Sequence, residues 1–78
     1  MKKEELIAFL REDAGLSTDE FDDHTLLFTD GYIDSFTLTA MLAFIEDKLN
    51  IRIAASAVTV ENFDSISRTM AYVGGLND

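Results

Sequence analysis

One serine stands where a helix is predicted to begin, and its position could support phosphate chemistry. The stretch Asp30–Phe36 places the hydroxyl of Ser35 one residue inside that helix, directly after Asp34. A phosphate ester on Ser35 would face the free backbone N–H groups and the positive dipole end of the helix. An Asp-Ser pair is also a common start for a helix with no chemical role. Spacing alone therefore leaves a phosphate-bearing and a purely structural interpretation open.

Catalysis by a histidine is a first alternative, and the sequence offers little for it. His24 is the only histidine, and a Ser–His–acid site would need Ser35 or another serine close to it. No Gly-x-Ser-x-Gly nucleophile motif is present. We therefore expect His24 to be an exposed loop residue and the chain to be no enzyme, with no catalytic residue.

Calcium binding is a second alternative, because several aspartates lie close together between Asp22 and Asp34. An EF-hand loop requires Asp or Asn at alternate positions before its glycine and a Glu six residues after it. Here Phe28 occupies one of the acidic positions, and Thr37 stands six residues after Gly31. We expect no dedicated metal site, and at most weak binding of divalent ions to the clustered acids.

The charge restricts the classes of partner. The chain has 78 residues, with 15 acidic and 6 basic side chains and a net charge of −9. Nucleic acids and anionic membranes both attract basic surfaces, so neither is an expected partner. Basic protein partners fit this charge, although acidity can also serve solubility alone. With no cysteine and one histidine, a Cys/His zinc site cannot be built.

Targeting segments are not evident in this sequence. The longest apolar run, Ala40–Ile45, is far shorter than the roughly 20 residues that a membrane-spanning helix needs. Glu4 and Glu5 directly follow the two N-terminal lysines, which does not fit a signal peptide. We expect one complete cytoplasmic domain over residues 1–78, present as a monomer.

The first part of the chain predicts a helix followed by a long connection. Apolar residues at helical spacing predict a helix over Lys3–Ala14. Gly15 is suited to a left-handed stop, after which Leu16 could fold back onto Leu10. The connection from Ser17 to Ile33 is acidic first and apolar later, which indicates that its later part packs against the domain.

The second predicted helix runs from its cap at Asp34 to Asn50. The Asp34 carboxylate can accept an orphan N–H group of the first turn. Ile33 and Leu38 are placed for a hydrophobic staple across the helix start. Asn50 can adopt the left-handed conformation that ends the helix. The apolar face of this helix comprises Leu38, Met41, Leu42, Ile45 and Leu49.

The remaining chain predicts two further helical segments. Residues 51–53 are expected to form an extended link, and Ala54–Thr59 a short third helix. The last helix is expected to begin near Asp64 as its cap and to end at Gly74-Gly75. No paired strands are evident. The fold class is therefore all-α, a four-helix bundle of three main helices and one short one.

These patterns resemble one family across nearly the whole chain. Asp34-Ser35-Phe36 resembles the Asp-Ser-Leu/Met/Phe attachment motif of acyl carrier proteins, which are small helical bundles. The approach through Gly31, the helix exit at Glu46-Asp47-Lys48-Leu49 and the stretch Asn62–Ile66 are also similar to stand-alone bacterial carriers. Length and acidity agree with this family.

The resemblance implies a cofactor and a set of partners. It implies that Ser35 receives 4′-phosphopantetheine from coenzyme A through a separate phosphopantetheinyl transferase. A loading ligase would then attach an acyl or aminoacyl cargo as a thioester, and a downstream transferase or synthase would take it. Asp34 would help the modifying enzyme to bind. Phe36 would touch partners, unless it packs on the loop that contains Tyr32.

Two departures from the family pattern indicate a specialised role. In many fatty-acid carriers the second helix presents several acids, whereas here none follows Asp34 until Glu46 and Asp47. The link Ala54–Ala57 lacks the proline and acids that are common in the family. We expect a discrete polyketide, nonribosomal peptide or aminoacyl carrier whose partner contacts Phe36 and Ala40, with charge only near Glu46 and Asp47. A fatty-acid carrier and an unmodified helical interaction module are the alternatives.

Overall fold

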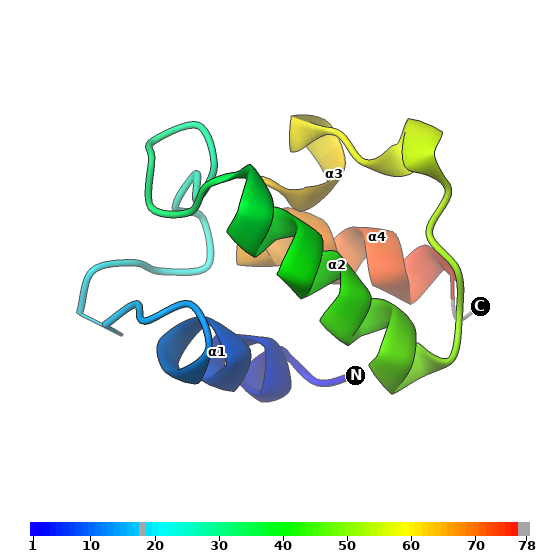
Figure 1. Cartoon of the computed structure of the whole chain (residues 1–78), viewed down its shortest axis with the longest axis horizontal. Coiled ribbons are helices and arrows are strands. Elements are labelled where there is room, and N and C mark those ends of the chain that lie inside the picture. The colour runs from blue at the N-terminus through cyan, green and yellow to red at the C-terminus, as the bar shows by residue number, and fades with distance from the viewer. Residues whose placement is uncertain (18, 77–78) are drawn as a thin grey trace.

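The computed structural model describes residues 1–17 and 19–76, all helix, turn or loop, with no strand in that part of the chain. Position 18 of the connection and residues 77 and 78 of the expected domain lie outside the described residues. The predicted all-α fold is confirmed (Figure 1). The elements are α1 (Lys3–Glu12), α2 (Ser35–Leu49), the single 3₁₀ turn η1 (Ala55–Ala57), α3 (Val60–Phe63) and α4 (Ile66–Leu76).

Two helix ends follow the local rules read from the sequence. Gly15 has a φ of +75°, and the N–H of Leu16 donates to the carbonyl of Leu10 at 2.9 Å. This bond turns the buried Leu16 back onto α1, as predicted, although α1 itself ends at Glu12. Asn50 has a φ of 53° and ends α2 in the left-handed conformation.

The short helical region differs from the prediction of one helix over Ala54–Thr59. The structure has the 3₁₀ turn η1 inside that range and the separate helix α3 just after it, starting at Val60. Phe63 of α3 is 1% exposed and packs edge-on against Tyr72 of α4, with ring centroids 5.1 Å apart. Burial of Phe63 thus places this helix later in the chain than propensity suggested.

The prediction that Gly74-Gly75 ends the last helix is wrong. Both glycines lie within α4, which continues to Leu76. Glycine permits a left-handed stop but does not impose one, and neither residue has a positive φ. Val73, directly before them, is 2% exposed, so packing secures the helix up to the glycines.

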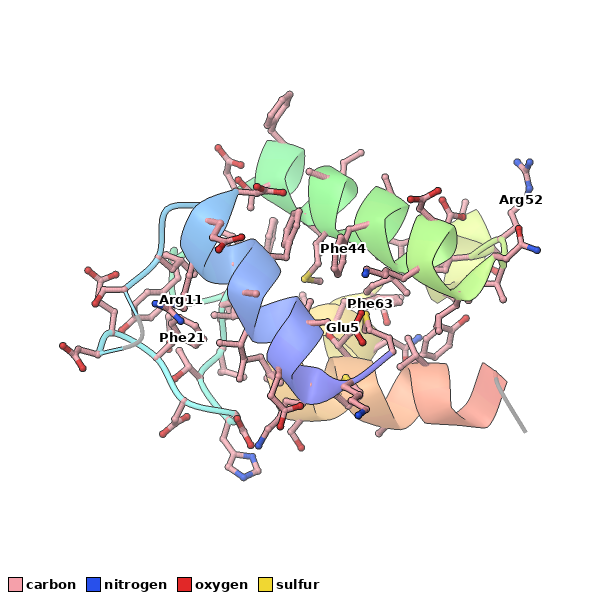
Figure 2. The ribbon with its side chains drawn as sticks, turned by 90° about the horizontal axis from the view of Figure 1, so that it is seen from below. Glu5, Arg11, Phe21, Phe44, Arg52 and Phe63 are labelled. Carbon is pink, nitrogen blue, oxygen red and sulfur yellow. The ribbon has the colours of Figure 1, made fainter. Side chains whose placement is uncertain are left out.

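The core lies between α1, α2 and α4 and is closed by residues of the long connection. Met41 and Ile45 of α2 are fully buried, and the other residues of its predicted apolar face pack partly buried against them. Phe44 adds a contact that the prediction lacked, because its ring stacks on Phe9 of α1 with centroids 4.9 Å apart. Figure 2 shows Phe44 and Phe63 pointing into the interior between the helices.

The first part of the long connection is fastened to α1 and α4. The Lys3 ammonium lies 2.8 Å from the Asp23 carboxylate, and the pairing raises the pKa of Lys3. The backbone carbonyl of Asp23 accepts the N–H of Ser67 at 2.9 Å. Contacts from α1 and from α4 therefore restrain this segment, whose described residues form no helix.

The second part of the connection is held by Asp64, which is not the cap of α4 as predicted. Its Oδ1 accepts the N–H groups of Phe28 and Thr29 at 2.8 and 3.0 Å, and its Oδ2 accepts the Thr29 hydroxyl. Its backbone carbonyl accepts the N–H of Leu27 at 2.6 Å. The cap of α4 is instead Ser65, whose Oγ accepts the N–H of Arg68.

The carboxyl group of Asp64 is an unusual buried charge, with the residue only 2% exposed. Burial acts to raise its pKa, but the hydrogen bonds from Thr29 and Phe28 outweigh burial, and nearby Arg68 adds to them. As a result, the pKa of Asp64 lies below the ordinary value of an aspartate. The ionised form therefore suits the folded state.

The exposed glycines of α4 give a first prediction. A Cβ added at Gly74 would meet no atom within 4 Å, so Gly74→Ala should raise the free energy of unfolding by about 0.5–1 kcal/mol. The matched control is Gly15→Ala, which should lower it because φ there is +75°. Urea unfolding measures both, and a stabilising Gly15→Ala would contradict this account of the two sites.

The depressed pKa of Asp64 gives a second prediction, for Asp64→Asn. The stabilisation from the ionised form is complete above the ordinary value of 3.8 and is lost as the pH falls through the lower folded-state pKa. At neutral pH the variant should be less stable by about 1–2 kcal/mol. Unfolding measured from pH 7 to 2 should show the two proteins converging in acid. A difference that stays constant over this range would refute the assignment.

Candidate functional site

Ser35 is the first residue of α2, and its side chain is exposed to solvent. Asp34 caps the helix as predicted, with its carboxylate accepting the N–H of Thr37 at 2.8 Å. This N–H is the main cause that lowers the pKa of Asp34 below its ordinary value. The cap therefore fixes the backbone on both sides of the Ser35 hydroxyl while leaving that hydroxyl accessible.

The start of α2 is compatible with a phosphate ester on Ser35. The helix is 15 residues long and has no acidic side chain in its first turn. Apart from Asp34, whose carboxylate already accepts an N–H group, no acidic side chain in the first turn would repel a phosphate at the positive end of the helix. The exposed hydroxyl and the neutral first turn fit the phosphate end of a phosphopantetheine group.

A closed turn of the connection leads into this site. Within it the N–H of Gly31 donates to the backbone carbonyl of Phe28 at 3.1 Å, and the N–H of Ile33 donates to the backbone carbonyl of Leu27 at 2.9 Å. Gly31 has a φ of +83°, which allows the chain to reverse. Ile33 is then buried, so the next two residues emerge at the surface as the cap and the start of α2. Figure 1 shows the connection at one end of the molecule, leading into α2.

Several apolar side chains are exposed on α2, on the turn before it and on α3. Phe36 is 81% exposed, which shows that it does not pack down on the loop of Tyr32, and Ala40 is exposed one turn further along. Tyr32, Phe28 and Val60 are each between 36% and 44% exposed. The residues that follow Ser35 on α2 are thus uncharged up to Glu46, whereas the Asp34 carboxylate lies directly before Ser35.

A small cavity lies beside this apolar surface. It has a volume of about 170 Å³ and lies between the turn of the connection, the start of α2 and α3. Its walls are mainly apolar, with Phe28, Leu38 and Val60 among them, and Asp64 forms part of its boundary. The same aspartate that fastens the turn thus borders the space next to the serine helix.

Glu46 and Asp47 lie near the other end of α2, roughly 16 Å along the helix from Ser35. Asp47 is exposed. Glu46 is half-buried, and its carboxylate accepts the N–H of Ile53 at 2.7 Å. Glu46 therefore holds the link after α2 in place, and Asp47 is the freer charge. Arg52 points outward at this end of the molecule (Figure 2).

The other sequence candidates lie apart from this site. His24 is exposed, and its backbone N–H donates to the Asp22 carboxylate in a local turn. Within residues 1–17 and 19–76, no group of three or more acidic or histidine side chains is arranged to hold a metal ion. In the same residues, no helix combines the length and the apolar character needed to cross a membrane.

Asp64 is the residue near the site whose role the sequence did not reveal. An aspartate at a predicted helix start is first interpreted as a cap, and the next residue, Ser65, performs that function instead. The available signal was indirect, because the backbone N–H groups of a packed loop need acceptors from elsewhere in the fold.

Comparison with family models gives one match, described as a phosphopantetheine attachment site, over residues 4–73. Neither the curated proteins nor the solved structures gave a match. The family match spans nearly all of α1, the long connection, α2, α3 and most of α4. Carrier domains of this kind are typically non-catalytic and interact with a phosphopantetheinyl transferase and with synthases or ligases. This chain belongs to the phosphopantetheine attachment family and is a carrier domain of the type that bears a covalent 4′-phosphopantetheine group.

Proposed function

We propose that Ser35 is the attachment residue and that this carrier presents an acyl or aminoacyl thioester to enzymes of a specialised biosynthetic pathway. The observation that carries the proposal is the exposed Ser35 hydroxyl at the capped start of α2. Ser65 provides a contrast, since it is 2% exposed and its hydroxyl already caps α4.

In the modification step, Ser35 Oγ bonds to the phosphorus that carries the pantetheine arm in coenzyme A. The pyrophosphate bond of coenzyme A breaks, the adenosine bisphosphate half leaves, and a base on the transferase takes the serine proton. The chain itself contributes an exposed serine on a helix start that the Asp34 cap holds in place.

The arm, when bound, supplies a thiol that forms the thioester with the cargo. This chain has no cysteine, so it could not hold a thioester without such a group. Because the arm is tethered at one exposed point, the domain raises the concentration of its cargo near the active site of a bound partner. The Asp34 side chain would contribute to binding of the modifying enzyme.

The neutral surface of α2 supports the specialised pathway over fatty-acid synthesis. Enzymes that bind acidic helices would find no charge on α2 between Ser35 and Glu46, and Glu46 is engaged with Ile53. Apolar contact through Phe36 and Ala40 is what this surface offers a loading ligase. A polyketide, nonribosomal peptide or aminoacyl pathway would supply such a partner.

Intact mass spectrometry tests the attachment residue. Protein co-expressed with a broad-specificity transferase should gain one phosphopantetheine group, located on the peptide that contains Ser35. Ser35→Ala should gain none and keep its helical circular dichroism, because the Asp34 cap does not use the serine hydroxyl. The control Ser67→Ala, altered at an exposed position in α4, should still be modified. Modification of Ser35→Ala would sink the proposal.

Loading kinetics test the apolar docking surface. Phe36→Ala should raise the KM of the cognate ligase for the holo carrier about tenfold, because an exposed aromatic anchor is lost. Asp47→Asn removes an exposed charge and should change KM by no more than about threefold, as for a surface ion pair. Both should be measured at two salt concentrations. A larger effect of Asp47→Asn, with loading that falls steeply in salt, would show that docking is electrostatic.

A further inference from the structure

We propose that Asp64 is a positioning residue for the modification of Ser35, acting through the turn that joins the long connection to α2. The inference rests on the proposed attachment at Ser35 and adds a second residue, 29 positions later in the chain, to the recognition of that site. Asp64 does not itself touch the reacting atoms; it sets where the segment before them lies.

Hydrogen bonds link Asp64 to the start of α2 in two steps. The first step joins its carboxylate and carbonyl to the N–H groups of three consecutive residues, Leu27 to Thr29. The second step joins the carbonyl of Leu27 to the N–H of Ile33 at 2.9 Å. Ile33 is two residues before Ser35 and is buried. A displacement of the turn would therefore move the cap residue and the serine with it.

Asp64 is suited to this function because it is itself firmly placed. Its N–H donates to the carbonyl of Val60 at 3.1 Å, which fixes it at the end of α3. Two side chains that follow it, Ser65 and Ile66, are buried in the start of α4. The carboxylate thus projects from the α3–α4 junction toward residues 27–29 of the connection, which form neither helix nor strand.

The same anchor sets the apolar surface near the serine. Phe28 donates its N–H to Asp64, and its ring borders the small cavity together with Val60. Tyr32 lies in the same closed turn, between Gly31 and Ile33. A partner that recognises the serine together with these aromatic rings would meet them in one arrangement only while Asp64 holds the turn.

Loss of the anchor should therefore reduce the fraction of molecules ready for recognition. When only a fraction of a protein is competent to bind, its apparent dissociation constant rises by the inverse of that fraction. Once bound, the serine would be modified at its usual rate. The expected signature is a higher KM of the transferase for the carrier with an unchanged kcat.

The test compares four variants of the full chain with the unmutated protein. Asp64→Ala removes every side-chain bond to the turn. Asp64→Asn is the conservative rescue, since its oxygen can accept both N–H groups and its amide can donate to Thr29. Thr29→Val removes one bond at an exposed position, where the fold is not at risk. Val73→Ala controls for general destabilisation, because it shortens a buried side chain of α4.

Two quantities should be measured for each variant: the transferase KM and kcat, and the amide hydrogen exchange of Phe28, Thr29 and Ile33. Asp64→Ala should raise KM roughly tenfold with kcat within about twofold, and exchange at these amides should accelerate. Asp64→Asn should recover KM to within about threefold, and Thr29→Val should raise it by about threefold. Val73→Ala should leave KM unchanged.

An Asp64→Ala variant whose KM matches that of Val73→Ala overturns the inference, and so does retained protection at the three amides. If Asp64→Ala fails to fold, an unchanged transferase KM in Thr29→Val overturns the inference by itself. If the unmutated chain is never modified at Ser35, the proposed function fails and this inference falls with it. Modification of the unmutated chain with no effect of Asp64 or Thr29 overturns this inference alone.

Discussion

The turn that leads into α2 is held by one buried residue, Asp64, which accepts the backbone N–H groups of three consecutive residues. The connection between α1 and α2 is long, and it is held by the burial of Leu27 and Ile33 together with hydrogen bonds to the rest of the fold. Asp64 accepts two backbone N–H groups and a hydroxyl with its side chain, and a third N–H with its carbonyl. Burying an ionised group is costly unless its oxygens are satisfied, so the anchor and the turn stabilise one another.

Packing holds α2 along its length, and a hydrogen bond holds the link that follows its C-terminal end. The stack of Phe44 on Phe9 joins α2 to α1, and Met41 and Ile45 fill the centre. At the C-terminal end, the carboxylate of Glu46 binds the N–H of Ile53 and draws in the following link. Because this acid is engaged with the fold, the exposed acid at that end of α2 is Asp47. The engagement of Glu46 within the fold is consistent with the proposed partner, which docks by apolar contact.

Local features of this fold could be predicted from the sequence, whereas long-range ones could not. The cap at Asp34 and the left-handed residues at Gly15 and Asn50 each depend on neighbours within one helical turn, and all three are confirmed. The anchor at Asp64 depends on residues 35 and 36 positions away, so a short-range rule assigned it a different role. The continuation of α4 through its glycines was likewise missed, because a glycine pair permits a left-handed stop that neither residue adopts. Attachment at Ser35 stays a prediction drawn from the motif and supported by its exposure.

The most direct test of this account is a titration followed by nuclear magnetic resonance. The side-chain carboxyl carbon of Asp64 and the amide protons of Phe28 and Thr29 should be recorded together as the pH is lowered. If the carboxylate holds the turn, all three signals should shift with one common midpoint below the ordinary value of 3.8. An Asp64 carboxyl that titrates at or above that value, while the two amide protons stay unmoved, would contradict the account.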